Sequence, residues 1–519
     1  MANLFKRIFS VFFIVFFMFT FFGCSNGGQQ YIDNDTENTS HKKEKESANT
    51  AEITVGVIEE DVYNPLLTKS STLKNMLGFI FEPLFKIDNN KQAVGVLAES
   101  YEVSPDGKSI RISLKKDAVW HNGKRFTTDD VIYTIDSIKN NYTEYDRFLV
   151  DVRSAEALDI YTLKVTFVRS VSDPVKLFSF PIIQKGTFDV KQKPIGTGPF
   201  CYGAKELKAF DDYYGNKPQV RTVKIKIVPA REKFVSLFNA SVIDVADSSV
   251  IDMKVLTPRN NANVIDYTSN EMVFVGLNSA NRVFSKKEAR RSIYELVNRK
   301  NIASHIYFSR ADVSFYPLSP ESDFYPNVES EVDGNVGEAE RCLQDNGWEK
   351  DGNGTYYLTT LAGVSYFSVD ILVNSEDEER VKIAMNLSET MSKLGMRNSV
   401  SQCSEAEFWA RINNRNYDMF IGKTTLLPNA DSSDLLAGEN IFNYSDEKMQ
   451  TLLSQLGTVN DNEDKAEVYG EFFEHFRKEC PIVPICFLKE SVITSAKIKS
   501  GVSPLVSGML VGTENWSVK

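Results

Sequence analysis

Residues 97–131 read LAESYEVSPDGKSIRISLKKDAVWHNGKRFTTDDV, and this stretch decides the fold class. Apolar and polar residues alternate over 108–114, which is the pattern of a strand with one face in a core. Asn122-Gly123 then supplies a tight turn. The stretch therefore predicts a strand that leads through a turn into a second element.

That second element is a helix over residues 129–139. Thr127 and Asp130 have the spacing of a capping box, and acidic residues in the first turn favour the positive end of a helix. The apolar positions recur at spacings of four and three, so one buried face is expected, formed by Val131, Ile135 and Ile138. A strand followed by a helix favours an α/β protein.

The alternation of strands and helices continues on both sides of this stretch. Upstream, residues 52–57 predict a strand, and residues 72–85 predict a helix that Glu82-Pro83 ends. The last third predicts a helix over 382–395, a strand over 398–403, a helix through Phe408, Trp409 and Ile412, and a buried strand over 417–422. The whole body is thus expected to be mixed α/β.

The first 24 residues form a targeting segment. Lys6 and Arg7 precede an apolar run over residues 8–22, which is shorter than the roughly 20 residues that a membrane-spanning helix needs. The run ends in Gly23-Cys24, which resembles the lipobox of bacterial lipoproteins. The resemblance implies that Cys24 is lipidated and holds the chain at the extracytoplasmic face of the cell membrane. An uncleaved anchor and ordinary secretion are the alternatives.

Composition bounds the remaining possibilities. Residues 25–50 are almost wholly polar and bury too little apolar surface to order themselves, so we expect a disordered tether. The 519 residues, of which 42% are apolar, are enough for two or three domains. The formal net charge of −11 argues against nucleic acid, whose phosphates attract clustered Lys and Arg.

No motif points to catalysis. GTGPF at 196–200 lacks the Gly-Lys-Ser/Thr end of a phosphate loop and predicts a backbone turn. The four His residues, at positions 41, 121, 305 and 475, lack the short paired spacings of a zinc site. The sequence also has no GxSxG elbow and no HExxH helix. We therefore expect a protein that is not an enzyme and that needs no cofactor and no protein-built metal site.

Five cysteines follow Cys24, so at least one thiol is unpaired in a monomer. Cys480 and Cys486 flank an apolar run that contains two prolines, and a disulfide between them is one possibility. Buried free thiols are the favoured state.

The stretch at 97–131 resembles the signature of family 5 extracellular solute-binding proteins, which are the oligopeptide, dipeptide and nickel receptors of ABC importers. Further motifs resemble the family in the same order along the chain. They are PIGTGPF at 194–200, DDYYGNKP at 211–218, the helix over 284–306 with Arg290 and Arg291, and the helix over 337–343 followed by Gly347-Trp348. The resemblance covers roughly residues 51–495.

This resemblance implies an α/β, two-lobed, periplasmic-binding-protein-like fold of the class II or cluster C type, with crossover strands and an inserted subdomain. The expected division follows the signal peptide (1–24) and the tether (25–50). Lobe one is expected to combine 51–87, 190–268 and 496–519, the inserted subdomain to span 88–189, and lobe two to span 269–495.

The implied function is that of a substrate-binding lipoprotein of a bacterial ABC importer. Such a protein captures a peptide or peptide-like solute between two closing lobes and delivers it to a membrane permease and its ATPase. We expect a monomer without a nucleic-acid partner. A peptide of unknown length, a metal chelate and a sugar remain open as ligands, because all are bound on this scaffold. A signalling-peptide receptor, a sensor or a chaperone on the same fold is the alternative.

Asp431 is the first ligand-binding candidate. In the family, the strand that corresponds to 417–422 runs into a loop with an aromatic residue and an Asp that pairs with the ligand's α-ammonium group. Here Lys423 replaces the aromatic residue, and Asp431-Ser432 replaces an Asp-Pro pair. The alternative is that Asp431 and Asp434 only cap the following turn.

Four further candidates come from two other segments. Asn64 and Ser71 lie in a loop that resembles the family's loop near the cleft, where they either bind ligand or serve the turn and the helix start. Asn270 and Glu271 lie within 268–272, where the family's chain crosses between lobes on a strand that often contacts ligand.

Overall fold

The structure is a computed structural model. It describes residues 51–58, 62–88, 90–188, 193–203, 205–249, 262–328, 332–361, 363–430, 432–459, 462–505 and 512–518. The expected signal peptide with Cys24, the expected tether, and the candidate Asp431 lie outside the described residues. Within the described ranges, no helix is long and apolar enough to cross a membrane.

The largest element in the described residues is an 11-stranded sheet with the order β18-β17-β19-β12-β20-β11-β1-β10-β9-β8, in which β13 also pairs with β20. Its strands are β1 (Glu52–Val57), β8 (Phe200–Tyr202), β9 (Glu206–Ala209), β10 (Thr222–Ile227), β11 (Val245–Asp247), β12 (Asn263–Leu277), β13 (Ala311–Val313), β17 (Ser368–Asn374), β18 (Arg397–Cys403), β19 (Met419–Thr425) and β20 (Ile482–Thr494). The strands predicted at 52–57, 398–403 and 417–422 are confirmed as β1, β18 and β19.

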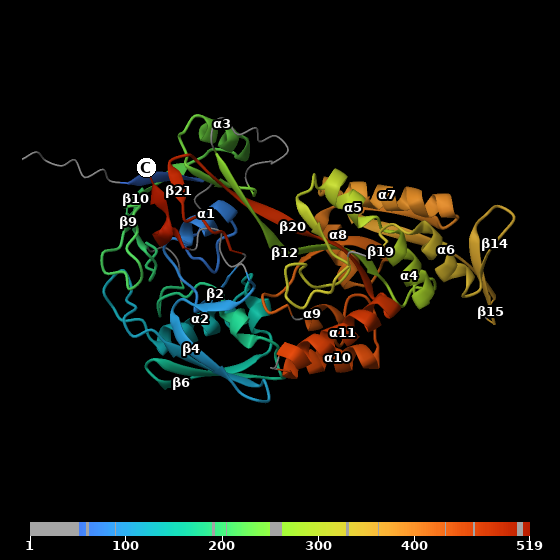
Figure 1. Cartoon of the computed structure of the whole chain (residues 1–519), viewed down its shortest axis with the longest axis horizontal. Helices are drawn as coiled ribbons and strands as arrows, with labels where there is room; N and C mark the ends of the chain where they lie inside the picture. Colours follow the sequence, from blue (N-terminus) through green and yellow to red (C-terminus); the bar gives the residue numbers. More distant parts are fainter. Residues whose placement is uncertain are drawn as a thin grey trace, which may run out of the picture. The chain divides into compact units, whose positions relative to one another are not determined.

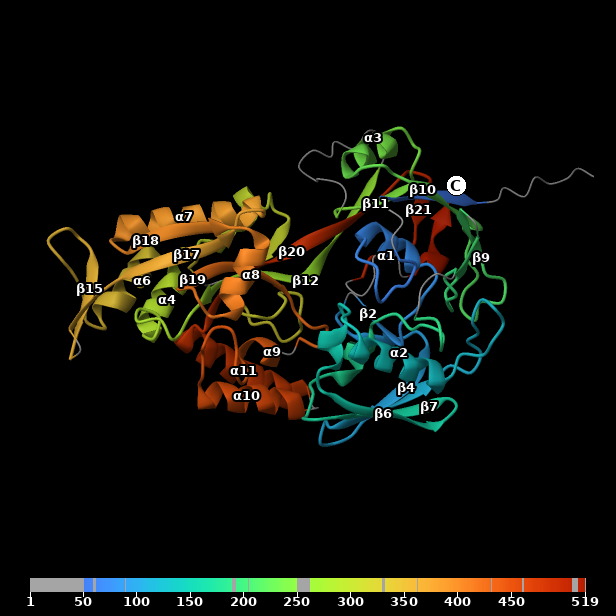
Figure 2. The same ribbon diagram turned by 180° about the vertical axis from the view of Figure 1, so that it is seen from behind.

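Two long strands, β12 and β20, join the two halves of this sheet. They pair antiparallel from Asn263 opposite Thr494 to Gly276 opposite Ile482. The C-terminal end of β20 also pairs with β11, whereas the C-terminal half of β12 pairs with β19. Figures 1 and 2 show both strands running from the blue and green elements to the orange ones. They correspond to the crossover strands that the family resemblance implies.

The apolar side chains gather in two main clusters along β12 and β20. Met272 and its neighbours in β12 belong to a cluster that extends to Phe487. Val492 of β20 belongs to the other cluster, which begins at Ile53. Leu427, from the loop after β19, packs in this second cluster and not in the one that holds β19 itself. That loop therefore connects the two cores a second time.

The stretch at 97–131 forms part of a four-stranded sheet and a helix, as predicted. The sheet has the order β4-β5-β7-β6 and consists of β4 (Ala98–Val103), β5 (Ser109–Leu114), β6 (Val152–Asp159) and β7 (Thr162–Phe167). The helix α2 (Thr128–Asn140) begins with the predicted capping box, in which the backbone N–H of Thr127 donates to the Asp130 carboxylate at 3.0 Å. Val131, Ile135 and Ile138 are buried as expected.

The remaining helices and small sheets complete the described part. The helices are α1 (Ser71–Leu77), α3 (Phe234–Asn239), α4 (Lys287–Leu296), α5 (Arg299–Asn301), α6 (Val336–Gln344), α7 (Glu378–Leu394), α8 (Glu405–Asn413), α9 (Ser433–Leu436), α10 (Glu447–Thr458) and α11 (Asn462–Glu479). The small sheets pair β2 (Phe85–Ile87) with β3 (Ala93–Gly95), β14 (Trp348–Lys350) with β15 (Tyr356–Thr360) and β16 (Gly363–Tyr366), and β21 (Ile498–Ser500) with β22 (Ser517–Val518). The two predicted helices of the last third are α7 and α8.

The helix predicted over 72–85 is much shorter than expected, because α1 ends at Leu77. The carbonyl groups of Phe79 and Ile80, which a longer helix would use, accept hydrogen bonds from another segment. The Phe79 carbonyl accepts the N–H of Phe200 at 3.2 Å, and the Ile80 carbonyl accepts the N–H of Gly198 at 2.9 Å. Partners from a distant segment thus replace the helical hydrogen bonds that the local pattern predicted.

All five cysteines in the described ranges are free, including Cys480, just before β20, and Cys486, within it. Both thiols are buried, and burial raises the pKa of Cys480 to about 12. The favoured prediction of free thiols is confirmed.

Candidate functional site

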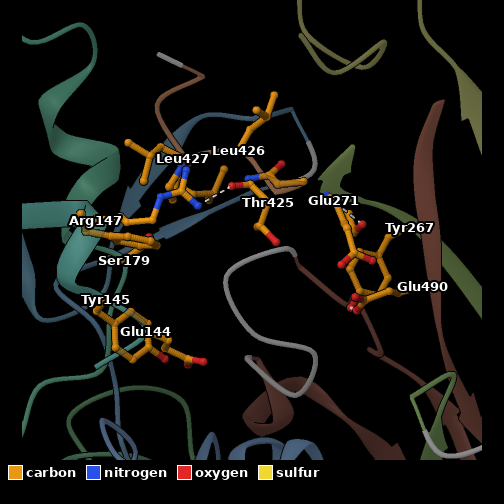
Figure 3. A pocket seen from close by; sticks show the side chains of 15 residues that line it. Glu144, Tyr145, Arg147, Ser179, Tyr267, Glu271, Thr425, Leu426, Leu427 and Glu490 are labelled. Carbon is orange, nitrogen blue, oxygen red and sulfur yellow. Dashed lines mark hydrogen bonds between the residues drawn. The ribbon is translucent and has the colours of Figure 1, made fainter. Parts of the chain in front are cut away.

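A cavity of about 420 Å³ lies beside the crossover strands (Figure 3). Its volume falls in the range of small-molecule sites, about 300–1,000 Å³, near the lower end. Its lining residues come from the end of β2, the segment after α2, Ser179, the crossover strands and the loop after β19. The lining residues are Ile87, Glu144, Tyr145, Arg147, Phe148, Ser179, Tyr267, Ser269, Asn270, Glu271, Thr425, Leu426, Leu427, Pro428 and Glu490.

An irregularity in the sheet shapes one wall of the cavity. The pairing of β12 with β20 shifts register between Thr268 and Met272, so the intervening residues leave the regular ladder. A bulge of this kind bends a strand and redirects its side chains. Ser269 and Asn270 lie in the irregular segment and line the cavity. The wall is anchored because the Ser269 hydroxyl donates to the Leu488 carbonyl at 2.8 Å.

Tyr267, Glu271 and Glu490 form the polar side of this wall, and Figure 3 shows them together. Tyr267 lies opposite Glu490 in the strand pairing, and its hydroxyl donates a hydrogen bond to the Glu490 carboxylate. Burial is the main cause that raises the pKa of Glu490, and the hydrogen bond from Tyr267 opposes it. Burial and the neighbouring Glu490 also raise the pKa of Tyr267, which keeps that hydroxyl protonated as a donor.

The opposite wall carries Glu144, Tyr145 and Arg147, which follow α2 in the chain (Figure 3). Arg147 donates to the Thr425 carbonyl at 3.0 Å and pairs with the Asp434 carboxylate. Arg147 therefore ties this wall to the loop after β19. Burial, followed by the charge of Glu144, raises the pKa of Tyr145 well above its usual value, so its hydroxyl stays neutral.

Beyond the cavity, a second set of contacts joins residues 172–173 to the loop after β19 and to α11. The Asn429 side chain donates to the Ser172 carbonyl at 2.9 Å. The Lys465 ammonium, which is buried, lies 3.0 Å from the Asp173 carboxylate. Burial opposes ionisation of Asp173, but Lys176 and Lys465 outweigh it and lower the pKa of this carboxyl. Asp173 is thus ionised at neutral pH.

Two of the predicted site residues, Asn270 and Glu271, line the cavity. The Asn270 carbonyl accepts the N–H of Leu426 at 2.9 Å, which holds the loop after β19 against β12. The Glu271 carboxylate lies 3.1 Å from the ammonium of Lys423. The segment at 268–272 is therefore part of the cavity wall.

Asn64 and Ser71 are not among the lining residues of this cavity. Asn64 is buried, donates to the Phe188 carbonyl at 2.9 Å and accepts the N–H of Leu66 at 2.9 Å, so its side chain orders a turn. Ser71 is the first residue of α1, and its hydroxyl lies 3.0 Å from the hydroxyl of Ser249. Both side chains thus make hydrogen bonds within the protein.

Sequence reasoning missed Tyr267, Glu490, Arg147 and Glu144. Tyr267 immediately precedes the segment 268–272, so a signal was present one residue away. Glu490, Arg147 and Glu144 carry no local signal, because each belongs to a segment that resembles no binding motif.

The family is decided by comparison with known proteins. The family model of bacterial extracellular solute-binding proteins, family 5 (middle part), matches residues 92–438, which is more than half of the chain. The chain belongs to this family. Family 5 proteins are non-enzymatic binding proteins, so the prediction that the chain is not an enzyme is confirmed.

Two curated relatives match most of the chain. The oligopeptide-binding protein AppA of Bacillus subtilis (strain 168) is 23% identical over 464 residues, which cover 83% of this chain and 85% of that protein. The nickel-binding periplasmic protein of Escherichia coli (strain K12) is 21% identical over 493 residues, which cover 86% and 90%.

A solved structure shows the same fold. The structure of HbpA2 from Haemophilus parasuis superimposes with a TM-score of 0.76 at 19% identity and covers 90% of this chain and 100% of that chain. The predicted fold class, a mixed α/β periplasmic-binding-protein fold of the cluster C type, is confirmed.

Proposed function

We propose that this chain is the substrate-binding component of a bacterial ABC importer, which captures a peptide or peptide-like solute and delivers it to a membrane permease. Membership of family 5 supports a solute-binding role outside the cytoplasm. The name of the Bacillus subtilis relative, an oligopeptide-binding protein, supports a peptide as the first solute class to test.

The observation that carries the proposal is the cavity beside β12 and β20. A solute in it contacts the crossover strands, the segment after α2 and the loop after β19 at the same time. The crossover strands connect the elements on either side of the cavity. A solute that binds between these elements favours their closure around it. A micromolar affinity corresponds to about −8.2 kcal/mol, which a few hydrogen bonds and an apolar surface supply.

In this proposal, the contacts of Arg147 with Thr425 and Asp434 belong to the closed form. The Asp173–Lys465 pair, beyond the cavity, also belongs to the closed form. A solute that fills the cavity favours the form in which these contacts exist, and a permease recognises that form.

Asp431 stays a proposed ligand residue for a cationic group. It lies between Ala430 and Ser432, and the Ser432 hydroxyl donates to the Pro317 carbonyl at 3.0 Å. Cys24 stays a proposed lipid anchor, and residues 25–50 a proposed tether.

The test is calorimetric titration of the full-length protein, extracted and purified in mild detergent, with tripeptides. We expect saturable one-to-one binding with micromolar or tighter dissociation constants. In cells, deletion of the gene is expected to abolish uptake of the same labelled peptide. Binding without uptake would instead support the alternative of a signalling-peptide receptor.

A further inference from the structure

The lining of the cavity carries more negative than positive charge. Glu144, Glu271 and Glu490 contribute three carboxylates, whereas Arg147 is the one cationic side chain among the described lining residues. Arg147 already pairs with the Asp434 carboxylate. Its positive charge is thus balanced before a solute arrives, and it offers little to an anionic solute.

The three carboxylates differ in their own partners. Glu144 pairs with Lys74, and Glu271 pairs with Lys423 at 3.1 Å. For Glu490, no Lys, Arg or His nitrogen of the described ranges lies within the 4.0 Å of an ion pair. Glu490 is therefore the lining carboxylate whose charge no described cation pairs directly.

The strand geometry explains why Glu490 lacks such a partner. Successive side chains of a strand point to opposite faces, so the neighbouring Lys489 points away from it. Lys489 instead pairs with Asp312 at 2.7 Å. Tyr267, opposite Glu490, supplies one hydroxyl donor but no charge.

We propose that the solute of this cavity carries a positively charged group, an ammonium or a guanidinium, which pairs with Glu490. The inference rests on the proposed function, because it takes the cavity as the solute site. A partly buried carboxylate is costly unless it is paired, and a charge-assisted hydrogen bond is stronger than a neutral one. A cationic group recovers that cost, and a neutral or anionic group does not.

This pairing makes binding depend on pH. The groups that face Glu490 are Tyr267 and Glu271 on β12, Lys423 on β19 and Asp247 on β11. Burial, the largest cause, raises the pKa of Glu490 above its ordinary value. Because the ionised carboxylate is the form that attracts a cation, affinity for a cationic solute falls as pH drops through this pKa.

The experiment titrates full-length protein in detergent with four tripeptides: Ala-Lys-Ala, N-acetyl-Ala-Lys-Ala, Ala-Met-Ala and N-acetyl-Ala-Met-Ala. The set separates a side-chain ammonium from a terminal ammonium, and the last peptide has neither. Wild type is compared with Glu490→Gln, which keeps an acceptor for the Tyr267 hydroxyl. Glu349→Gln is the matched control, because it changes the net charge equally but lies on β14, outside the cavity lining.

We expect at least one peptide with an ammonium group to bind wild type about tenfold to a hundredfold more tightly than N-acetyl-Ala-Met-Ala. Glu490→Gln is expected to abolish that preference, and Glu349→Gln to keep it. In wild type, acidification is expected to weaken binding of the preferred peptide more than binding of N-acetyl-Ala-Met-Ala. This arm does not depend on the folding of a variant.

Equal affinity for all four peptides, or an equal loss for charged and neutral peptides in Glu490→Gln, would overturn the inference while leaving peptide binding intact. Failure of all four peptides to bind wild type would instead remove the proposed peptide function, and the inference with it.

Discussion

Substituting Glu82 by Gln is expected to change how stability depends on pH. Glu82 is 6% exposed and accepts hydrogen bonds from the hydroxyls of Tyr213 at 2.7 Å and Tyr214 at 3.1 Å. Burial raises the pKa of Glu82 from 4.5 to about 7, against the opposing hydrogen bonds. In the folded protein this carboxyl therefore holds its proton at a pH where the unfolded chain has lost it.

The sign follows from proton linkage. Between pH 4.5 and pH 7 the Glu82 carboxyl binds more protons in the folded state than in the unfolded state. Its contribution to the free energy of unfolding therefore falls as pH rises. One pKa unit corresponds to about 1.4 kcal/mol, and the contribution of Glu82 between pH 5 and pH 8 is therefore roughly 2 to 3 kcal/mol. The unit Thr50–Lys519 has about 470 residues, for which this free energy shifts the melting temperature by about 2–3 °C.

The assay is thermal unfolding of full-length wild type and Glu82→Gln in detergent at pH 5 and pH 8. Gln keeps an acceptor for the tyrosine hydroxyls but cannot ionise. We expect the melting temperature of Glu82→Gln, relative to wild type, to be about 2–3 °C higher at pH 8 than at pH 5. Glu102→Gln, on the exposed face of β4, is expected to show no such change. A Glu82→Gln difference that is the same at both pH values would refute the reasoning.

Three further outcomes are expected. Cys24→Ala releases the protein from the membrane fraction and removes lipid label, whereas unchanged fractionation and labelling would exclude the anchor. Lys465→Met weakens tripeptide binding about fivefold by removing the pair with Asp173, and Lys448→Met on the exposed face of α10 does not; equal affinities would exclude a role in closure. Burial lowers the pKa of His121 to about 4, so the free energy of unfolding falls as pH drops from 6.5 to 4. We expect His121→Asn to reduce this loss of stability in thermal unfolding. If the loss were the same in the variant, groups other than His121 would be its cause.

Local signals in the sequence were sufficient for the elements whose hydrogen bonds are local. The capping box of Thr127 and Asp130 and the alternation in β5 describe contacts between near neighbours, and both were predicted correctly. The helix after Ser71 was predicted too long, since Gly198 binds the Ile80 carbonyl from a segment far along the chain.

The family motifs predicted the fold and not the cavity, because they supply none of the residues that line it. Gly196 of the GTGPF turn lies so close to the Ile80 carbonyl that a Cβ atom would approach its oxygen to 1.8 Å. Tyr213 and Tyr214 of the second motif bind Glu82. These residues hold the scaffold together.

The cavity itself could not be derived from local pattern, because its polar contacts join distant segments. Tyr267 and Glu490 are 223 positions apart, and Arg147 and Thr425 are 278 positions apart. Asn270 and Glu271 were identified because they lie on a crossover strand whose place the family resemblance supplied. Only the fold shows that the Glu490 carboxylate lies in the cavity.

A crystal structure of the protein with a bound tripeptide would show whether the solute occupies the cavity beside β12 and β20. We expect peptide density between Tyr267 and Glu490 on one side and Tyr145 and Arg147 on the other. Peptide bound elsewhere on the protein, with this cavity empty at saturating concentration, would contradict this expectation.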